Sequence, residues 1–195
     1  LCLGGQWINC EMRLGKVRDD TQFSFQSAFP GVPASFSQID AAVYYTFNAG
    51  SSNYGFLFNE NQCIKYTMLT NGTYTYGSVT SIAEEWPGVG FTKIDAAINW
   101  WNGYVYLFSG NQYVKFSISE NAIVSGYPKP IQGNWNGLPF DSLTAAVSIN
   151  NLEEKPSVAY LFKDDEYVCF DMQADKAFSG YPVKIKNWQQ MFVPR

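Results

Sequence analysis

Carboxylates are the side chains in this sequence best suited to transfer a proton or to hold a cation. Adjacent acidic residues occur at Asp19–Asp20, Glu84–Glu85, Glu153–Glu154 and Asp164–Glu166. Glycoside hydrolysis requires two carboxyl groups that converge on one bond in a cleft. Most of these pairs fall in segments that read as hairpin turns or a short helical end, where solvated charge is the default, so we expect no catalytic pair.

The absence of histidine excludes many other chemistries. None of the 195 residues is histidine, which removes Ser-His-Asp and Cys-His nucleophiles, histidine-containing zinc sites and a bis-imidazole haem clamp. We therefore predict that the chain is not an enzyme. The formal net charge is −4, with 13 Lys+Arg against 17 Asp+Glu and no basic cluster, so a nucleic-acid partner is not expected.

The sequence contains an internal repeat, which must position the remaining candidate residues. Three apolar openings begin at residues 39, 94 and 143, with the sequences Ile-Asp-Ala-Ala-Val, Ile-Asp-Ala-Ala-Ile and Leu-Thr-Ala-Ala-Val. An aromatic-rich segment follows each opening, at 54–58, 104–108 and 158–162. A polar turn and a further alternating segment come next, at 62–66, 112–116 and 166–170. Alternation of this kind predicts antiparallel strands joined by tight hairpins.

The first 38 residues follow the same register only from the third strand of the unit onward, through Gln6–Cys10 and Phe29–Pro33. Four units of about 50 residues, each with four short strands, predict an all-β, four-bladed β-propeller. The blades are expected at 1–38 (partial), 39–93, 94–142 and 143–195, as a single domain over 1–195. Because the first blade lacks its opening strand, we expect about 14 or more residues before Leu1 in the natural protein. A β-sandwich with chance similarity is the weaker alternative.

Several motifs of the repeat resemble the hemopexin-like family. They are Ile-Asp-Ala-Ala, Tyr-Leu-Phe before a polar turn, Gln-Tyr-Val-Lys-Phe, Gly-Tyr-Pro and Trp-Pro-Gly. A free-standing chain of four such repeats looks most like the seed albumin-2 type, and less like the C-terminal domain of matrix metalloproteinases or half of serum hemopexin.

Backbone carbonyls of the innermost strands are expected to line a channel and to hold a hard cation. The resemblance implies the same site, with calcium as the cation and sodium and chloride as further channel ions. The predicted carbonyl ligands are Asp40, Asp95 and Thr144, with a deeper ring at Ala42, Ala97 and Ala146. The alternative for Asp40 and Asp95 is that their carboxylates only accept backbone N–H bonds at strand starts.

The cysteines do not establish an oxidising compartment. Cys63 and Cys169 fall on third strands of opposite blades, too far apart to pair, so we predict buried free thiols. Cys2 and Cys10 fall on neighbouring strands of the first unit, and whether they pair is open. Asn71 begins an Asn-Gly-Thr sequon and is a candidate glycosylation site.

Trp100, Trp101 and Tyr104 surround a polar turn, where they would either stack on a ligand or pack between blades, and packing is favoured.

The resemblance implies a non-enzymatic binding protein, compatible with seed storage, whose ligand is a polyamine such as spermine or else haem. The alternatives are a lectin-like or protein-interaction module that binds a glycan or a protein, or the exosite domain of a metalloprotease. The chain has no long apolar run, so we expect a soluble monomer or dimer, either in the seed cytosol or a storage compartment or outside the cell.

Overall fold

The computed structural model describes residues 29–34, 36, 38–46, 53–69, 73–149 and 157–185, Ser27, and five short strands near the N-terminus. The chain divides into two compact units, and each is described here by itself. One unit joins Leu1–Gln38 to Lys184–Arg195, and the other is Ile39–Val183. The larger unit begins where the second blade was predicted to begin. Among the described residues, no helix is long and apolar enough to cross a bilayer.

The smaller unit contains pairs of very short strands. They are β1 (Cys2–Leu3), β2 (Gln6–Trp7), β3 (Cys10–Glu11), β4 (Lys16–Val17) and β5 (Phe23–Ser24). One sheet has the order β1-β2-β5, and β3 pairs with β4 separately. Cys2 and Cys10 therefore lie on strands that do not pair with each other, and their side chains fall outside the described part of the structure.

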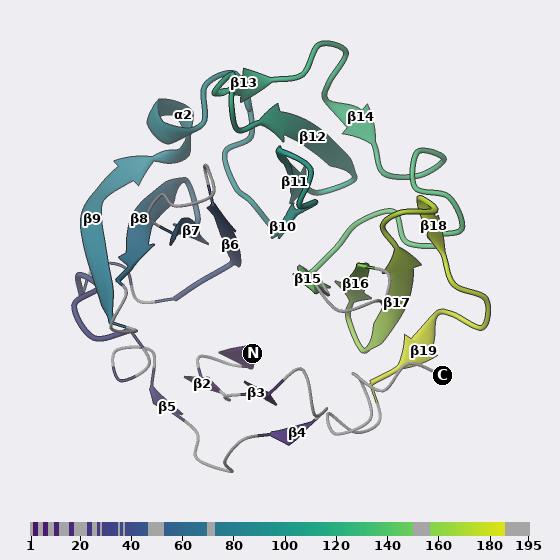
Figure 1. The fold of residues 1–195 in the computed structure, drawn as a ribbon, viewed down its shortest axis with the longest axis horizontal. Helices are drawn as coiled ribbons and strands as arrows, with labels where there is room; N and C mark the ends of the chain where they lie inside the picture. Colours follow the sequence, from purple (N-terminus) through teal and green to yellow (C-terminus); the bar gives the residue numbers. More distant parts are fainter. Residues whose placement is uncertain are drawn as a thin grey trace. The chain divides into compact units, whose positions relative to one another are not determined.

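The larger unit consists of three antiparallel sheets, each formed by consecutive strands (Figure 1). The first contains β6 (Ala41–Thr46), β7 (Asn53–Asn59), β8 (Gln62–Met68) and β9 (Tyr74–Ser81). The second contains β10 (Ala96–Asn99), β11 (Tyr104–Ser109), β12 (Gln112–Ser117), β13 (Ala122–Ile123) and β14 (Lys129–Pro130). The third contains β15 (Ala145–Ile149), β16 (Val158–Lys163), β17 (Glu166–Asp171), β18 (Lys176–Ala177) and β19 (Val183–Lys184). The all-β prediction is confirmed, and the three antiparallel sheets fall within residues 39–93, 94–142 and 143–195.

The three sheets share one register. The backbone N–H groups of Asp40, Asp95 and Thr144 donate to the carbonyls of Phe58, Phe108 and Phe162 at 2.8, 2.8 and 2.9 Å, respectively. Each residue directly precedes the first strand of its sheet, and each phenylalanine lies near the end of the second strand. The sequence repeat is therefore a repeat of backbone hydrogen bonds.

Alternation along the strands buries both faces of the middle sheet. On β11, Val105 and Leu107 belong to one hydrophobic cluster and Phe108 belongs to another. Because side chains alternate between the faces of a strand, the middle sheet packs on the first sheet through one face and on the third sheet through the other.

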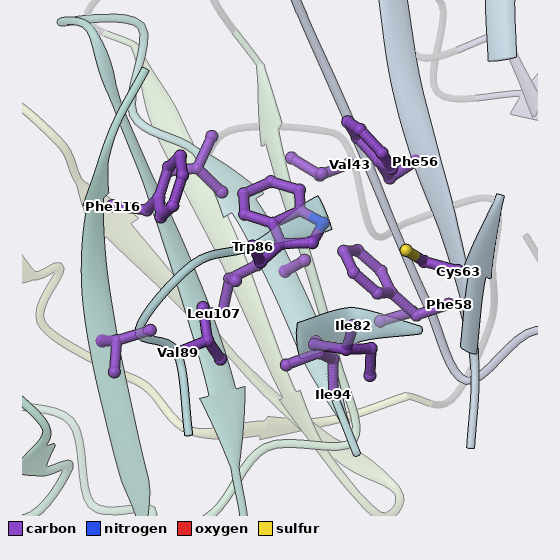
Figure 2. Close-up of a cluster of buried hydrophobic side chains, with 14 of the residues drawn as sticks. Val43, Phe56, Phe58, Cys63, Ile82, Trp86, Val89, Ile94, Leu107 and Phe116 are labelled. Carbon is purple, nitrogen blue, oxygen red and sulfur yellow. The ribbon is translucent and has the colours of Figure 1, made fainter. Parts of the chain in front are cut away.

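A tryptophan lies at the centre of each hydrophobic cluster. Figure 2 shows Trp86 between Phe56 and Phe58 on one side and Phe116 on the other. Its ring centroid lies 5.0 Å from that of Phe56 and 4.8 Å from that of Phe116, in edge-to-face geometry. Trp135 repeats the arrangement in the second cluster, 5.4 Å from Phe170. Trp86 and Trp135 thus fill the spaces between neighbouring sheets, as aromatic burial favours.

One helical turn, α2 (Ile82–Glu85), follows β9 directly. Ser81 caps it, since its Oγ accepts from the Glu84 N–H while the Glu84 carboxylate accepts from the Ser81 N–H. This capping box satisfies two backbone donors at the start of the turn. The turn places Ile82 in the cluster around Trp86.

Candidate functional site

The first strand of each sheet lies toward the middle of the larger unit (Figure 1). Strand β10 contacts β6 on one side and β15 on the other. Asp40, Asp95 and Thr144 precede these strands at equivalent positions, as their shared backbone bonds show. The structure therefore places the three predicted residues at the same end of three neighbouring strands.

One oxygen of each aspartate is committed to the fold. Asp40 Oδ2 accepts from the Glu60 N–H at 2.7 Å, and Asp95 Oδ2 accepts from the Gly110 N–H at 2.8 Å. Both donors lie in the hairpin turn between the second and third strands. The carboxylates of Asp40 and Asp95 thus accept backbone N–H bonds, which is the alternative role predicted for them. The second oxygen of each carboxylate is left available.

Lys93 occupies the space between the two remaining oxygens. Its Nζ lies 3.4 Å from Asp40 Oδ1 and 3.6 Å from Asp95 Oδ1. Burial alone would lower the pKa of this lysine, but the two carboxylates outweigh burial and hold the pKa above its usual value. Two carboxylates from neighbouring sheets therefore bind one alkylammonium group. Sequence reasoning missed Lys93, although its position two residues before Asp95 was a usable signal.

The third sheet departs from this arrangement. Thr144 Oγ1 donates to the Phe162 carbonyl at 3.3 Å, so the side chain turns back onto its own sheet. Nearby, Lys163 Nζ donates to Ser142 Oγ at 2.5 Å, and Ser142 Oγ donates to Asp141 Oδ1 at 3.2 Å. Only the first two sheets present a carboxylate at this position.

The end of the unit that carries Asp40 and Asp95 also carries the hairpin turns between second and third strands. We call this region the acidic end, and the acidic residues described there include Asp40, Glu60, Asp95, Asp141, Asp164, Asp165 and Glu166. The lysines at this end are Lys93, Lys129 and Lys163. Because acidic groups outnumber lysines, the field there attracts cations.

The three predicted deeper residues have unequal surroundings. Ala97 is buried in the cluster around Trp86, whereas Ala42 is exposed and Ala146 is half-buried. Within the described residues, no three His, Cys, Asp or Glu side chains cluster so that they could hold a metal ion. The predicted calcium site uses backbone carbonyls instead, and it stays a prediction.

Neither described cysteine is a nucleophile at neutral pH. Cys63 and Cys169 are both free and buried, as predicted. Burial raises the pKa of each thiol to about 11, although hydrogen bonds from Thr80 to Cys63 and from Tyr160 and Tyr181 to Cys169 favour the thiolate. Both groups therefore stay protonated, and they serve as packing. The sequon residue Asn71 lies outside the described residues.

The aromatic cluster at 100–104 splits into three roles. Trp100 packs as predicted, with its ring centroid 5.4 Å from that of Trp135 in the second cluster. Tyr104 lies under Lys115, whose Nζ is 4.0 Å from the ring centroid. Trp101 packs only in part: it is 36% exposed, while its ring lies 6.5 Å from that of Tyr44 on β6 and its Nε1 donates to Ser148 Oγ on β15 at 2.9 Å. Its backbone φ is 58°.

Sequence and structure comparisons identify what the repeat is similar to. The family model described as Hemopexin matches residues 94–139, which include the strands β10 to β14. Human matrix metalloproteinase-21 is 26% identical over 134 residues, covering 64% of this chain and 23% of the relative. Rat hemopexin is 41% identical over 71 residues, covering 34% of this chain and 15% of the relative. The chain thus spans less than a quarter of the length of these curated relatives.

Solved plant proteins share the fold over most of the chain. A hemopexin-fold protein, CP4 from cow pea, has a TM-score of 0.72 at 23% identity, covering 95% of this chain and 87% of that one. A 2S albumin seed protein from Dolichos has a TM-score of 0.67 at 25% identity, covering 85% and 77%. A plant lectin with two metal binding sites from Cicer arietinum has a TM-score of 0.61 at 24% identity, covering 77% and 69%.

Proposed function

We propose that this hemopexin-repeat chain, which shares its fold with plant seed albumins, is a non-enzymatic binding protein for a polyamine such as spermine. The polyamine binds at the acidic end of the larger unit. One observation carries the proposal: Lys93 Nζ lies between Asp40 Oδ1 and Asp95 Oδ1, at 3.4 and 3.6 Å. This contact of the chain's own lysine supports the binding of a primary alkylammonium group at this position.

The surrounding charge suits a ligand with several ammonium groups. Carboxylates outnumber lysines among the described residues of the acidic end, and the whole chain has a net charge of −4. A linear polyamine carries ammonium groups separated by short apolar segments, so one molecule reaches several carboxylates at once. Charged hydrogen bonds of this kind are stronger than neutral ones, and the field also speeds the encounter with a polycation.

The proposal includes a closed, four-bladed propeller in which the smaller unit provides the remaining blade. A cation, with calcium as the first candidate, would then lie on the axis. The carbonyls of Asp40, Asp95 and Thr144 would hold it, with those of Ala42, Ala97 and Ala146 deeper. Backbone carbonyls are ligands that calcium accepts. Sodium and chloride are the further channel ions that this arrangement would admit.

Haem is the weaker ligand for these residues. Without histidine, an axial ligand would come from Tyr, Cys or Met. The two described thiols are buried with pKa values raised to about 11, and burial raises the pKa of Tyr45, Tyr66 and Tyr160 as well. A storage role for the protein is compatible with a bound polyamine.

Native mass spectrometry tests both parts of the proposal. Wild-type protein and the Asp40→Asn/Asp95→Asn double variant would be exchanged into calcium-containing buffer and then mixed with spermine. We expect one spermine adduct on wild type, strongly reduced in the double variant, because the variant removes two charges without changing side-chain size. An unchanged spermine adduct in the variant would refute the polyamine site. A calcium adduct lost with EDTA would support the axial cation, and its absence would refute that part alone.

A further inference from the structure

Two Asn-Gly dipeptides with closely matching neighbours lie in turns of the larger unit. Their sequences are Trp-Asn-Gly-Tyr at 101–104 and Trp-Asn-Gly-Leu at 135–138. Both residues of each dipeptide are exposed. A third dipeptide, Asn71–Gly72, lies outside the described residues. Because the flanking residues match, a difference in reactivity between Asn102 and Asn136 in the folded protein has to come from the structure.

An asparagine that precedes a glycine can lose its side-chain amide without an enzyme. The backbone nitrogen of the glycine gives up its proton and bonds to Cγ of the asparagine, the Cγ–Nδ2 bond breaks, and the amide nitrogen takes up a proton and leaves as ammonia. Water then opens the cyclic imide, which gives aspartate or the isomer whose main chain runs through Cγ. Glycine favours the attack because it has no Cβ to hinder the close approach. The reaction also requires a peptide unit that is free to rotate.

The peptide unit between Asn102 and Gly103 meets these conditions. Within the described residues, no hydrogen bond involves the Asn102 side chain, the Asn102 carbonyl or the Gly103 N–H. The space beside Gly103 is open, since a Cβ there would meet no atom within 4 Å. The Gly103 nitrogen and Cγ of Asn102 are therefore free to approach each other.

The groups on either side of this peptide unit are held in place. Trp101 Nε1 donates to Ser148 Oγ at 2.9 Å, and the Gly103 carbonyl accepts from the Ile118 N–H at 3.0 Å. The freedom to rotate is thus confined to the unit that reacts. The reaction at Asn102 does not require the sheets to unfold.

The matching peptide unit between Asn136 and Gly137 is restrained. The Asn136 carbonyl accepts from the Ala177 N–H on β18 of the third sheet at 2.9 Å. Gly137 packs against the same residue, because a Cβ at Gly137 would lie 3.2 Å from Ala177 Cβ. Rotation of this unit would break the hydrogen bond to β18 and press the glycine against Ala177. The structure thus distinguishes two dipeptides that the sequence makes equivalent.

We propose that Asn102 is a site of spontaneous deamidation in the folded protein and that Asn136 is protected. Either product at position 102 adds one negative charge to a chain whose formal net charge is −4. The isomer also lengthens the main chain inside the turn that the hydrogen bond from the Trp100 N–H to the Tyr104 carbonyl closes at 3.0 Å. This modification is independent of the proposed polyamine binding.

The test follows both asparagines in the same intact protein. Wild-type protein would be kept in mildly alkaline buffer at physiological temperature, and peptide mapping by mass spectrometry would measure the conversion of each asparagine over time. We expect Asn102 to convert at least about fivefold faster than Asn136, which is about 1 kcal/mol in activation free energy. In urea, where both turns are unfolded, the two rates should be similar because the flanking residues match.

Two results would overturn the inference. One is equal rates at Asn102 and Asn136 in the folded protein, and the other is no conversion at Asn102 in the folded protein while both sites convert in urea. Circular dichroism during the incubation would confirm that the protein stays folded, so that the rates belong to the folded state.

Discussion

Lys93 Nζ lies 3.4 Å from Asp40 Oδ1, which joins the loop before β10 to the residue before β6 in the neighbouring sheet. Half of the lysine side chain is exposed, whereas most of the aspartate side chain is covered. The carboxylate is thus the fixed partner and the ammonium is the exchangeable one. A ligand that brings its own ammonium groups would compete with Lys93 for a preformed acceptor.

Replacing the competing lysine should strengthen polyamine binding. In Lys93→Met both aspartate oxygens become free, so we expect spermine affinity to rise by roughly threefold to tenfold, which is up to about 1.4 kcal/mol. The variant should lose less than about 1 kcal/mol of stability, because exposed ion pairs contribute little. Calorimetric titration would measure the affinity. The control is Lys176→Met, which makes the same change in net charge on β18; an equal rise in both variants would contradict local competition.

The buried thiols predict how stability depends on pH. An exposed thiol of an unfolded chain ionises near its ordinary pKa of 9.0, whereas Cys63 and Cys169 ionise at about 11 in the folded protein. The folded state therefore binds more protons between these values, so the stabilisation from this difference is present below pH 9 and is lost as pH rises toward 11. Urea unfolding of wild type and of a Cys63→Ala/Cys169→Ala variant would measure it. Tyrosines also titrate here, so the difference between the two proteins is the relevant quantity, and equal pH slopes would contradict the prediction.

Gly55 on β7 should not tolerate a side chain. A Cβ at this position would lie 2.2 Å from the Val43 carbonyl oxygen and 2.5 Å from the Tyr66 hydroxyl oxygen. Because the backbone contact cannot relax without moving β6, Gly55→Ala should lower the free energy of unfolding by about 1–3 kcal/mol. Gly77→Ala is the matched control, since its nearest contact would be 3.6 Å. Chemical denaturation should show little change in the control, and comparable losses in both would refute the argument.

Asn99 should contribute more to stability than an exposed amide with a similar bond. Asn99→Ala leaves the Tyr44 carbonyl and the Trp101 N–H without their partner in a buried region, so we expect a loss of about 1–3 kcal/mol. The control is Asn134→Ala, because Asn134 Nδ2 donates to the Pro130 carbonyl at 3.0 Å in an exposed turn. Thermal and urea unfolding would compare them. If both substitutions lower the free energy of unfolding equally, the Asn99 link between β6 and β10 does not stabilise this end of the strands.

The periodic parts of the fold could be predicted from the sequence. Alternating apolar residues and recurring hairpin turns located the strands of three complete sheets, because these features act within one repeat. Trp86 and Trp135 recur at equivalent positions of the repeat, and they occupy equivalent places between sheets. Alternation and turn residues can be recognised in the sequence without knowing how the repeats pack on one another.

Features that depend on contacts between repeats were harder to predict. Lys93 lies two residues before Asp95 in the sequence, but its second partner, Asp40, comes within reach only when β6 and β10 lie side by side. Trp101 has the residue type of a core side chain. No pattern in the sequence indicated its positive φ or its partial exposure. The sequence shows that Thr144 departs from the aspartate pattern, but it does not predict the hydrogen bond from Thr144 Oγ1 to the Phe162 carbonyl.

Calorimetric titration of spermine into wild type and into Asp40→Asn/Asp95→Asn, both in calcium-containing buffer, tests the central claim most directly. If the two carboxylates form the ammonium site, wild type should bind one spermine per chain and the double variant should bind at least tenfold more weakly, a difference of about 1.4 kcal/mol or more. Raising the salt concentration should weaken binding to wild type, because the interaction is electrostatic. Equal affinities for the two proteins, or no heat from wild type, would contradict the account.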